Sequence, residues 1–202
     1  SESEREVLLE GNLLWSRIWH EPESALAREH IAKSGFTDPE QALQLIKDLQ
    51  TDTDDLQDIA DDRLARLMPV ILRLASREEL PGVVLKRCID LIEAITRRSI
   101  YLAFLNENID ALQRMVRLFA ISPYVATQIA RFPILLYDLT DWEIEQEPAS
   151  KAQLEQRLNE ELGQFAPADL ESRMDVLRTF KHSVGLKIAM FELLDLQSTM
   201  KA

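Results

Sequence analysis

The sequence predicts an all-α protein, an irregular multi-helix array or bundle of about nine to ten helices that ends in one long helix. Three observations predict this fold class. Only 5 of the 202 residues are glycine, whereas α/β enzymes use glycine in turns and phosphate-binding loops. Leu, Ala, Arg, Glu and Gln, which favour helices, dominate the composition. Apolar residues recur at steps of three and four, and no segment has the pattern of a strand.

The first 80 residues carry start and stop signals for several helices. Gly35 stands where a helix C′ residue belongs. Asp38-Pro39 offers an N-cap followed by a proline in the first helical turn. Pro69 lies inside a helical pattern, where we expect it to kink the helix or divide it. The predicted helices are 3–20, 23–33, 39–50 and 56–76.

Residues 51–55, Thr-Asp-Thr-Asp-Asp, form an acidic turn between two of these helices. Two carboxylates two residues apart on a strand can share one Mg²⁺. Here no strand and no glycine-rich loop precede the pair Asp52 and Asp54. We therefore interpret these acids as caps of the following helix, where they favour its positive end.

The middle of the chain is the most apolar. Leu80-Pro81-Gly82 predicts a break, after which one long central helix is expected, with Glu93 and Arg97 as an i,i+4 pair. Asn108 and Ser122 are expected to be the N-caps of the next two helices. The predicted helices of this section are 83–105, 109–120, 123–131 and 133–139.

The last section begins with an acidic connector, 142–148. Ser150 is expected to cap a helix that runs to about Phe165, and one long helix is expected from Leu170 to at least Leu196. Gly185 inside that helix costs roughly 1 kcal/mol relative to alanine, which suggests close packing against a neighbour.

The net charge is −12 and is unevenly distributed. Residues 1–62 hold 16 acids and 5 bases, 63–140 hold 7 and 11, 141–175 hold 10 and 3, and 176–202 hold 2 and 4. An acidic surface disfavours nucleic acids and anionic membranes, so we expect neither as a partner. No apolar run approaches the roughly 18 residues of a membrane helix, and the N-terminal residues do not have the pattern of a secretory signal.

No residues form a recognisable catalytic, cofactor-binding or metal-binding pattern. Cys88, the single cysteine, lies in an apolar run, so we expect a buried thiol and a cytoplasmic protein. His20, His30 and His182 are scattered, and their spacing is poor for a metal site.

Some polar residues could nevertheless contact an effector or a neighbouring domain. The alternative for these residues is pairing with helix C-termini and local carboxylates, or simple solvation. The candidates are Arg97, Asn108, Arg131, Arg178 and Lys181.

A specific combination of residues resembles a known family. The similar motifs are Arg97-x-x-x-Tyr101-Leu102-x-x-Leu105, Asn108-x-x-Ala111-Leu112, Ser122-Pro123-x-x-Ala126-x-Gln128-x-Ala130-Arg131-x-Pro133-x-Leu135-Leu136-x-x-Leu139-x-Asp141, Leu177-Arg178-x-Phe180-Lys181 and Leu186-Lys187-Ile188-Ala189. They resemble the helical region that joins the two nucleotidyltransferase domains of the bifunctional glutamine synthetase adenylyltransferase/adenylyl-removing enzyme family. The resemblance is strongest over 97–141 and weak before residue 60.

This resemblance implies a single helical regulatory or linker region over 1–202. It has a more divergent section at 1–80, signature helices at 81–141 and a helical lead-in at 150–202 to a nucleotidyltransferase domain that lies outside the chain. The parent would transfer AMP from ATP to glutamine synthetase and remove it by phosphorolysis, under the control of glutamine and PII. ATP and Mg²⁺ would bind Gly-x-Gly-Lys-Leu-Gly-Gly and Asp-x-Asp motifs in the parent's catalytic domains. This chain lacks the glycine motif, and Asp52 and Asp54 do not match the family's Asp-x-Asp without it, so we expect the fragment itself to be inactive.

Three roles remain open at this point. The first is a silent linker that transmits effector state to the flanking nucleotidyltransferase domains, with Pro69, Pro123 and Pro133 as candidate hinges. The second is a glutamine sensor that uses Arg97 or Arg131 with Asn108. The third is an adaptor that docks PII or glutamine synthetase through its acidic N-terminal helices.

Overall fold

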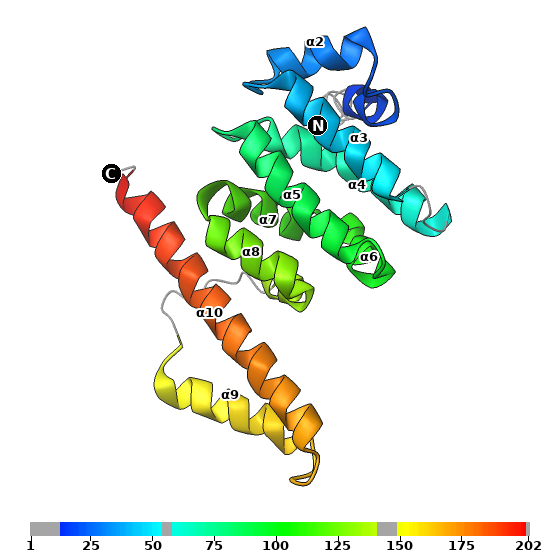
Figure 1. Ribbon diagram of the computed structural model, residues 1–202. Helices are drawn as coiled ribbons and strands as arrows, with labels where there is room; N and C mark the ends of the chain where they lie inside the picture. The colour runs from blue at the N-terminus through cyan, green and yellow to red at the C-terminus, as the bar shows by residue number, and fades with distance from the viewer. Residues whose placement is uncertain (1–12, 54–57, 141–148, 201–202) are drawn as a thin grey trace, which may run out of the picture. The chain divides into compact units, whose positions relative to one another are not determined.

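A computed structural model describes residues 13–53, 58–140 and 149–200, and these are helical with no strand among them (Figure 1). This confirms the all-α prediction and the long last helix. Two compact units divide the chain, Ser1–Pro133 and Ile134–Ala202. Residues 13–20 are helical and are followed by α2 (Ala25–Lys33), α3 (Pro39–Thr53), α4 (Asp58–Ala75), α5 (Pro81–Ile95), α6 (Ser99–Glu107), α7 (Ile109–Ile121), α8 (Pro123–Arg131), the 3₁₀ helix η1 (Pro133–Leu139), α9 (Lys151–Gly163) and α10 (Leu170–Met200).

The ends of α2 and α3 form as the sequence predicts. Gly35 has φ +85°, the left-handed conformation that favours glycine after a helix. The Asp38 carboxylate accepts a hydrogen bond of 2.9 Å from the backbone N–H of Gln41, so Asp38 caps α3. Helix α3 ends at Thr53, three residues later than the predicted end at Gln50. Asp54 and Asp55, also predicted as caps, lie outside the described residues.

Pro69 does not divide α4, which runs unbroken from Asp58 to Ala75. The proposed division was wrong. A proline inside a helix costs about 3 kcal/mol, while full burial of a large aliphatic side chain contributes about 1.5–3 kcal/mol. Helix α4 buries a whole face of such side chains around the proline, namely Leu64, Leu67, Met68, Ile71 and Leu72.

The single helix predicted over 83–105 is instead two helices, α5 and α6. The break comes at Arg98, whose φ of −119° and ψ of 77° are not helical. The break lets α6 pack mainly on α4, while α5 packs on α8 and also contacts α3, α4 and α7. Arg97 lies in the turn, and the described residues show no ion pair between it and Glu93. The predicted pair was therefore wrong.

Two further predictions about helix ends need correction. Leu80-Pro81-Gly82 is not simply a break, because Pro81 is the first residue of α5, where its missing N–H costs nothing. Asn108 does not cap α7 through its side chain. Its amide donates a hydrogen bond of 2.8 Å back to the carbonyl of Phe104 and so serves the end of α6.

Helices α7 and α8 meet at a corner that the sequence predicts correctly. The Ser122 hydroxyl accepts a hydrogen bond of 3.2 Å from the backbone N–H of Val125, and Pro123 opens α8. Helix α5 lies in the middle of the first unit, with α7 and α8 among its neighbours (Figure 1). One face of α5 is fully buried, including Leu85, Cys88 and Ile92, so this helix forms the centre of the core.

The second unit contains α9 and α10, which pack on each other (Figure 1). Ser150 and Gln153 form a reciprocal capping box at the start of α9. The Asp169 carboxylate accepts a hydrogen bond of 3.1 Å from the N–H of Ser172 and caps α10. The Arg173 guanidinium donates a hydrogen bond of 2.9 Å to the carbonyl of Leu162, which ties the two helices together.

Gly185 lacks the close neighbour that its presence suggested. A Cβ built there meets nothing within 4 Å, so the inference of close packing was wrong. We expect Gly185→Ala to raise the free energy of unfolding by up to about 1 kcal/mol, because alanine restricts the unfolded chain and favours the helix. Urea denaturation followed by circular dichroism measures this change. Gly35→Ala is the matched control and should destabilise, because φ is +85° there; a less stable Gly185→Ala chain would contradict the expectation.

Candidate functional site

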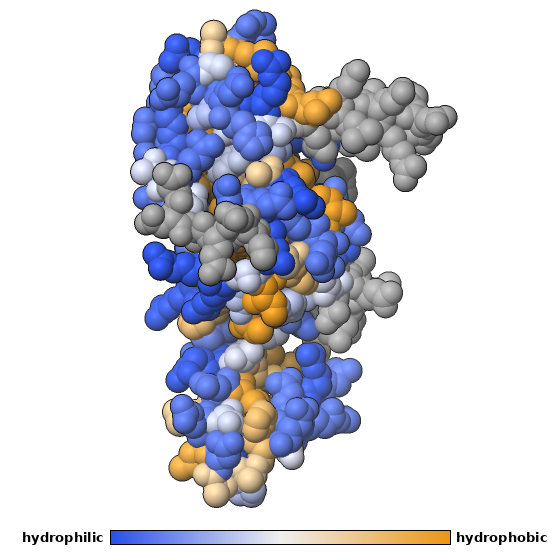
Figure 2. Space-filling view, turned by 90° about the vertical axis from the view of Figure 1, so that its right-hand side faces the viewer, coloured by the Kyte–Doolittle hydropathy of each residue, from blue (hydrophilic) through white to orange (hydrophobic). Residues whose placement is uncertain are grey.

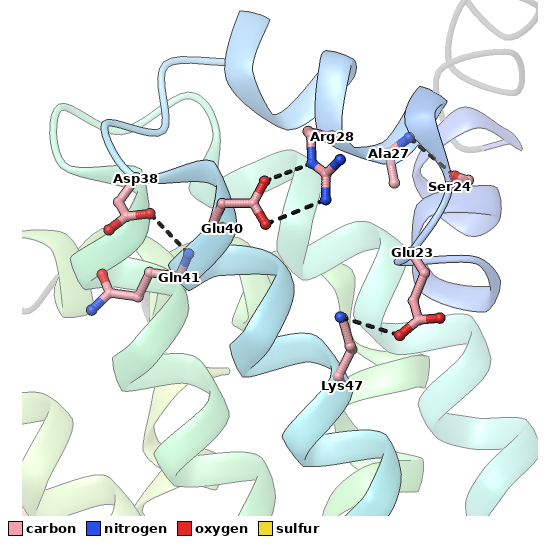
Figure 3. A network of polar contacts seen from close by, with 8 residues as sticks. All are labelled: Glu23, Ser24, Ala27, Arg28, Asp38, Glu40, Gln41 and Lys47. Carbon is pink, nitrogen blue, oxygen red and sulfur yellow. Dashed lines mark hydrogen bonds and ion pairs between the residues drawn. The ribbon is translucent and has the colours of Figure 1, made fainter.

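The N-terminal helices were candidates for docking a partner through their acidic surface. Figure 3 shows that basic side chains there are paired with carboxylates of the same unit. Arg28 Nε lies 2.6 Å from a Glu40 oxygen, and Lys47 Nζ lies 3.3 Å from a Glu23 oxygen. The carboxylates are largely exposed, so each pair contributes at most about 1 kcal/mol. These pairs join α2 and the residue Glu23 before it to α3.

His30 has a packing role in the same region. Its ring meets Trp15 edge to face, with centroids 4.7 Å apart, a favourable aromatic arrangement. Burial lowers the pKa of His30 below its ordinary value, and the nearby positive charge of Lys33 lowers it further. This contact with Trp15 places the half-buried His30 ring at the boundary of the core.

Arg97, Asn108 and Arg131, the residues expected to bind glutamine, lie at three different helix junctions. Arg97 is exposed in the turn after α5. The Asn108 amide donates its hydrogen bond to the carbonyl of Phe104 at the end of α6. Arg131 is exposed in the last turn of α8, with its guanidinium 5.4 Å from the ring centroid of Phe132, a cation–π distance. Within the described part of the chain, no hydrogen bond or ion pair connects any two of them. A glutamine site at these residues stays a prediction.

The remaining two candidates lie on α10. Arg178 pairs with Asp175 at 2.7 Å, and both side chains are exposed. Lys181 is also exposed. The pairing of Arg178 is local, as the alternative interpretation expected, whereas Lys181 lies among exposed apolar residues of α10.

An apolar stripe on α10 remains uncovered. We call it the α10 stripe and define it by its exposed apolar residues, with their exposed fractions: Leu170 (69%), Met174 (59%), Leu177 (46%) and Ile188 (42%). Figure 2 shows apolar residues gathered at the lower end of the view, over the region of α9 and α10. The helical spacing of these four residues predicts an apolar side of the last helix. It does not predict that this side is left exposed.

An arginine with a buried Nε atom was missed in the sequence. Nε of Arg73 is buried and has no hydrogen-bond partner in the described residues. Burial lowers the pKa of Arg73, and the positive charge of Arg77 lowers it further. The i,i+4 spacing of these two arginines was the available signal, but only the fold shows that one of them is partly enclosed.

Other polar side chains join helices to one another. The Arg63 guanidinium donates a hydrogen bond of 2.9 Å to the carbonyl of Ser99, and the Asn106 amide donates one of 3.1 Å to the carbonyl of Arg63, so α4 and α6 are tied from both sides. Arg87 of α5 donates to the carbonyl of Phe119 in α7. These donors fix the arrangement of the helices.

Among residues 13–53, 58–140 and 149–200, no three His, Cys, Asp or Glu side chains lie close enough together to hold a metal ion. The same described residues include no helix that is both long enough and apolar enough to cross a membrane.

Known proteins match this chain over nearly all of its length. The family model for glutamate-ammonia ligase adenylyltransferase matches residues 112–202. A bifunctional glutamine synthetase adenylyltransferase/adenylyl-removing enzyme from Pseudomonas aeruginosa is 37% identical over 190 residues, which are 93% of this chain and 19% of that protein. The enzymes of the same description from Pseudomonas syringae pv. tomato and Thioalkalivibrio sulfidiphilus are 36% and 35% identical, each over 95% of this chain and 20% of their own length. The chain thus spans about a fifth of the length of the curated relatives it matches.

Proposed function

Since this chain belongs to the glutamate-ammonia ligase adenylyltransferase family, we propose that it is a non-catalytic helical region of such an enzyme. It links two nucleotidyltransferase domains and relays the regulation of AMP transfer to and from glutamine synthetase. The proposal includes partners that follow from the family, namely the flanking domains, glutamine synthetase and PII. The proposal places ATP and Mg²⁺ in the catalytic domains of the longer enzyme.

The observation that carries the proposal is how closely successive helices of the first unit are coupled. Asn108 alone separates the end of α6 at Glu107 from the start of α7 at Ile109. Ser122 alone separates the end of α7 at Ile121 from the start of α8 at Pro123. A one-residue junction can turn like a hinge but has little slack, so a shift of one helix is passed to the next.

The core gives this coupling a rigid frame. Helix α5 contacts α3, α4, α6, α7 and α8, and its apolar face is fully buried. Close-packed interiors transmit displacements because they hold few voids. Regulation through such a frame needs two arrangements of the helices, each favoured by a different effector. The corner at Ser122-Pro123 is the place where we expect the two arrangements to differ.

The test uses the longer enzyme that contains this chain. A Gly-Ser-Gly insertion between Ile121 and Ser122 keeps the cap of α8 but uncouples it from α7. Allosteric coupling is typically worth about 5–150-fold. We expect the ratio of AMP-transfer rates with and without glutamine to fall toward one, while the rate without effector is retained.

The matched control is the same insertion between Glu79 and Leu80, in the longer turn between α4 and α5, with helix content of both variants checked by circular dichroism. An unchanged effector response after the insertion at Ser122 would refute the relay. AMP transfer by the 202-residue chain alone, with ATP and Mg²⁺, would refute the non-catalytic role. If calorimetry shows that the 202-residue chain itself binds glutamine, the chain is a glutamine sensor rather than a relay.

A further inference from the structure

We propose that the α10 stripe is the docking surface for one amphipathic helix supplied by the rest of the same polypeptide, with an acidic side chain opposite Lys181. The inference rests on the proposed function, because it needs a longer enzyme that contains this chain. It deepens that function by naming the surface through which the second unit is held and the chemistry of its partner.

The spacing of the stripe indicates a coiled-coil type of contact. Apolar residues follow one another at alternate steps of four and three, which is the heptad pattern of a helix that packs along another helix. Lys181 is the one polar residue at these positions. The heptad positions of this side of α10 are Leu170, Met174, Leu177, Lys181, Val184, Ile188 and Phe191. Val184 and Phe191 are half-buried, so the open part of the α10 stripe is at Leu170, Met174, Leu177 and Ile188.

Helix α9 covers a different side of α10. Arg173, which donates to the carbonyl of Leu162 in α9, marks the covered side. Val176 and Phe180 follow it at helical spacing and are half-buried. Each lies one residue, or about 100° of rotation, before a stripe position. Leu170, Met174 and Leu177 therefore remain open after α9 has packed.

The charges argue against a second copy of this chain as the occupant. Lys181 lies near the middle of the stripe, so a parallel pair in register, or an antiparallel pair centred on the stripe, brings two Lys181 side chains together. Like charges at such a position disfavour the pair, and a polar residue there selects the partner. Arg178 and Lys187 lie beside the stripe, each near a carboxylate of its own unit, Asp175 at 2.7 Å and Asp138 at 4.0 Å. Lys181 is the position left for a carboxylate of the partner helix.

The length of the relatives points to the source of that helix. The chain covers 19% of one relative and 20% of two others, so most of an enzyme of that length lies outside it. An exposed apolar stripe is an aggregation liability unless it is covered. A contact of about three heptads suffices within one polypeptide, because the effective concentration of a tethered partner is in the millimolar range.

Thiol labelling tests the proposal. Leu177→Cys is made in the 202-residue chain and in the longer enzyme, and its reaction with a maleimide is followed by mass spectrometry of the peptide that carries it. Cys88 is buried in α5 and does not compete. Thr179→Cys is the matched control, because Thr179 is exposed and lies two residues, about 200°, from Leu177. We expect position 177 to react at least about tenfold more slowly in the longer enzyme, with position 179 unchanged.

Charge variants test the chemistry of the partner. Lys181→Glu in the longer enzyme should restore fast labelling at position 177, and Lys181→Arg should keep it slow. Equal labelling of position 177 in both lengths of chain would overturn the docking. Slow labelling that persists with Lys181→Glu would overturn the acidic partner. If labelling of position 177 in the 202-residue chain becomes slower as its concentration rises, the occupant of the α10 stripe is a second copy of this chain instead.

The same Leu177→Cys enzyme separates this inference from the proposed function. Its response to glutamine is measured beside its labelling. Fast labelling of position 177 together with a normal response to glutamine refutes the docking and leaves the relay intact. If position 177 is labelled slowly but the insertion at Ser122 leaves the response to glutamine unchanged, the relay is refuted and the docking stands.

Discussion

Replacing Phe119 by alanine is expected to lower the free energy of unfolding of the first unit by about 3–5 kcal/mol. Phe119 in α7 is one of the largest fully buried side chains. The substitution removes apolar contacts and leaves a cavity that the surrounding helices close only in part. The hydrogen bond from Arg87 goes to the backbone carbonyl of Phe119, so the variant keeps that link and reports packing.

Urea denaturation followed by circular dichroism measures this loss. Tyr124→Ala is the control, because Tyr124 lies in the neighbouring helix α8 and is 58% exposed. Surface substitutions usually change stability by no more than about 0.5 kcal/mol. A change of less than about 1 kcal/mol for Phe119→Ala would show that α7 does not pack against a closed core.

The thiol of Cys88 is expected to resist alkylation in the folded chain and to react at the ordinary rate only after unfolding. Burial raises the pKa of Cys88 far above its usual range, so the reactive thiolate is scarce. The side chain also lies inside α5 with no exposed surface, so a reagent reaches it only when the core opens. We expect labelling at neutral pH to be slower than in urea by about three orders of magnitude or more.

The two expectations are linked, which makes each a check on the other. If alkylation of Cys88 requires opening of the first unit, Phe119→Ala should accelerate it by about two to four orders of magnitude, as its loss of stability of about 3–5 kcal/mol dictates. Tyr124→Ala should leave the rate unchanged. Fast alkylation of the folded parent chain would contradict the buried position of Cys88, and an unchanged rate in Phe119→Ala would show that the thiol reacts through a local opening of α5.

Much of the local structure could be predicted because it depends on neighbouring residues. Asp38, Ser122 and Ser150 cap helices through hydrogen bonds to backbone groups three residues away, and Gly35 adopts its left-handed conformation in the turn after α2. Such signals are complete within a few residues of sequence. The family could be predicted for the same reason, because its motifs are combinations of residues along the chain.

The candidate site could be predicted only in part. Arg97, Asn108 and Arg131 were grouped by their residue types, but each lies at its own helix junction, and Asn108 uses its amide for α6. The α10 stripe could be predicted as an apolar pattern. That α9 covers the adjacent side and leaves it open depends on how the two helices pack.

The sequence by itself determined the helical class, most helix ends and the family of this protein, because propensity, capping and motif are properties of short stretches. Tertiary structure alone decided that α5 and α6 part at Arg98, that Pro69 stays within one helix, and that Gly185 faces open space. The physical reason is common to all three. Each depends on whether residues distant in the sequence pack at that place. Burial outweighs the local cost of about 3 kcal/mol at Pro69, whereas no side chain comes close to Gly185.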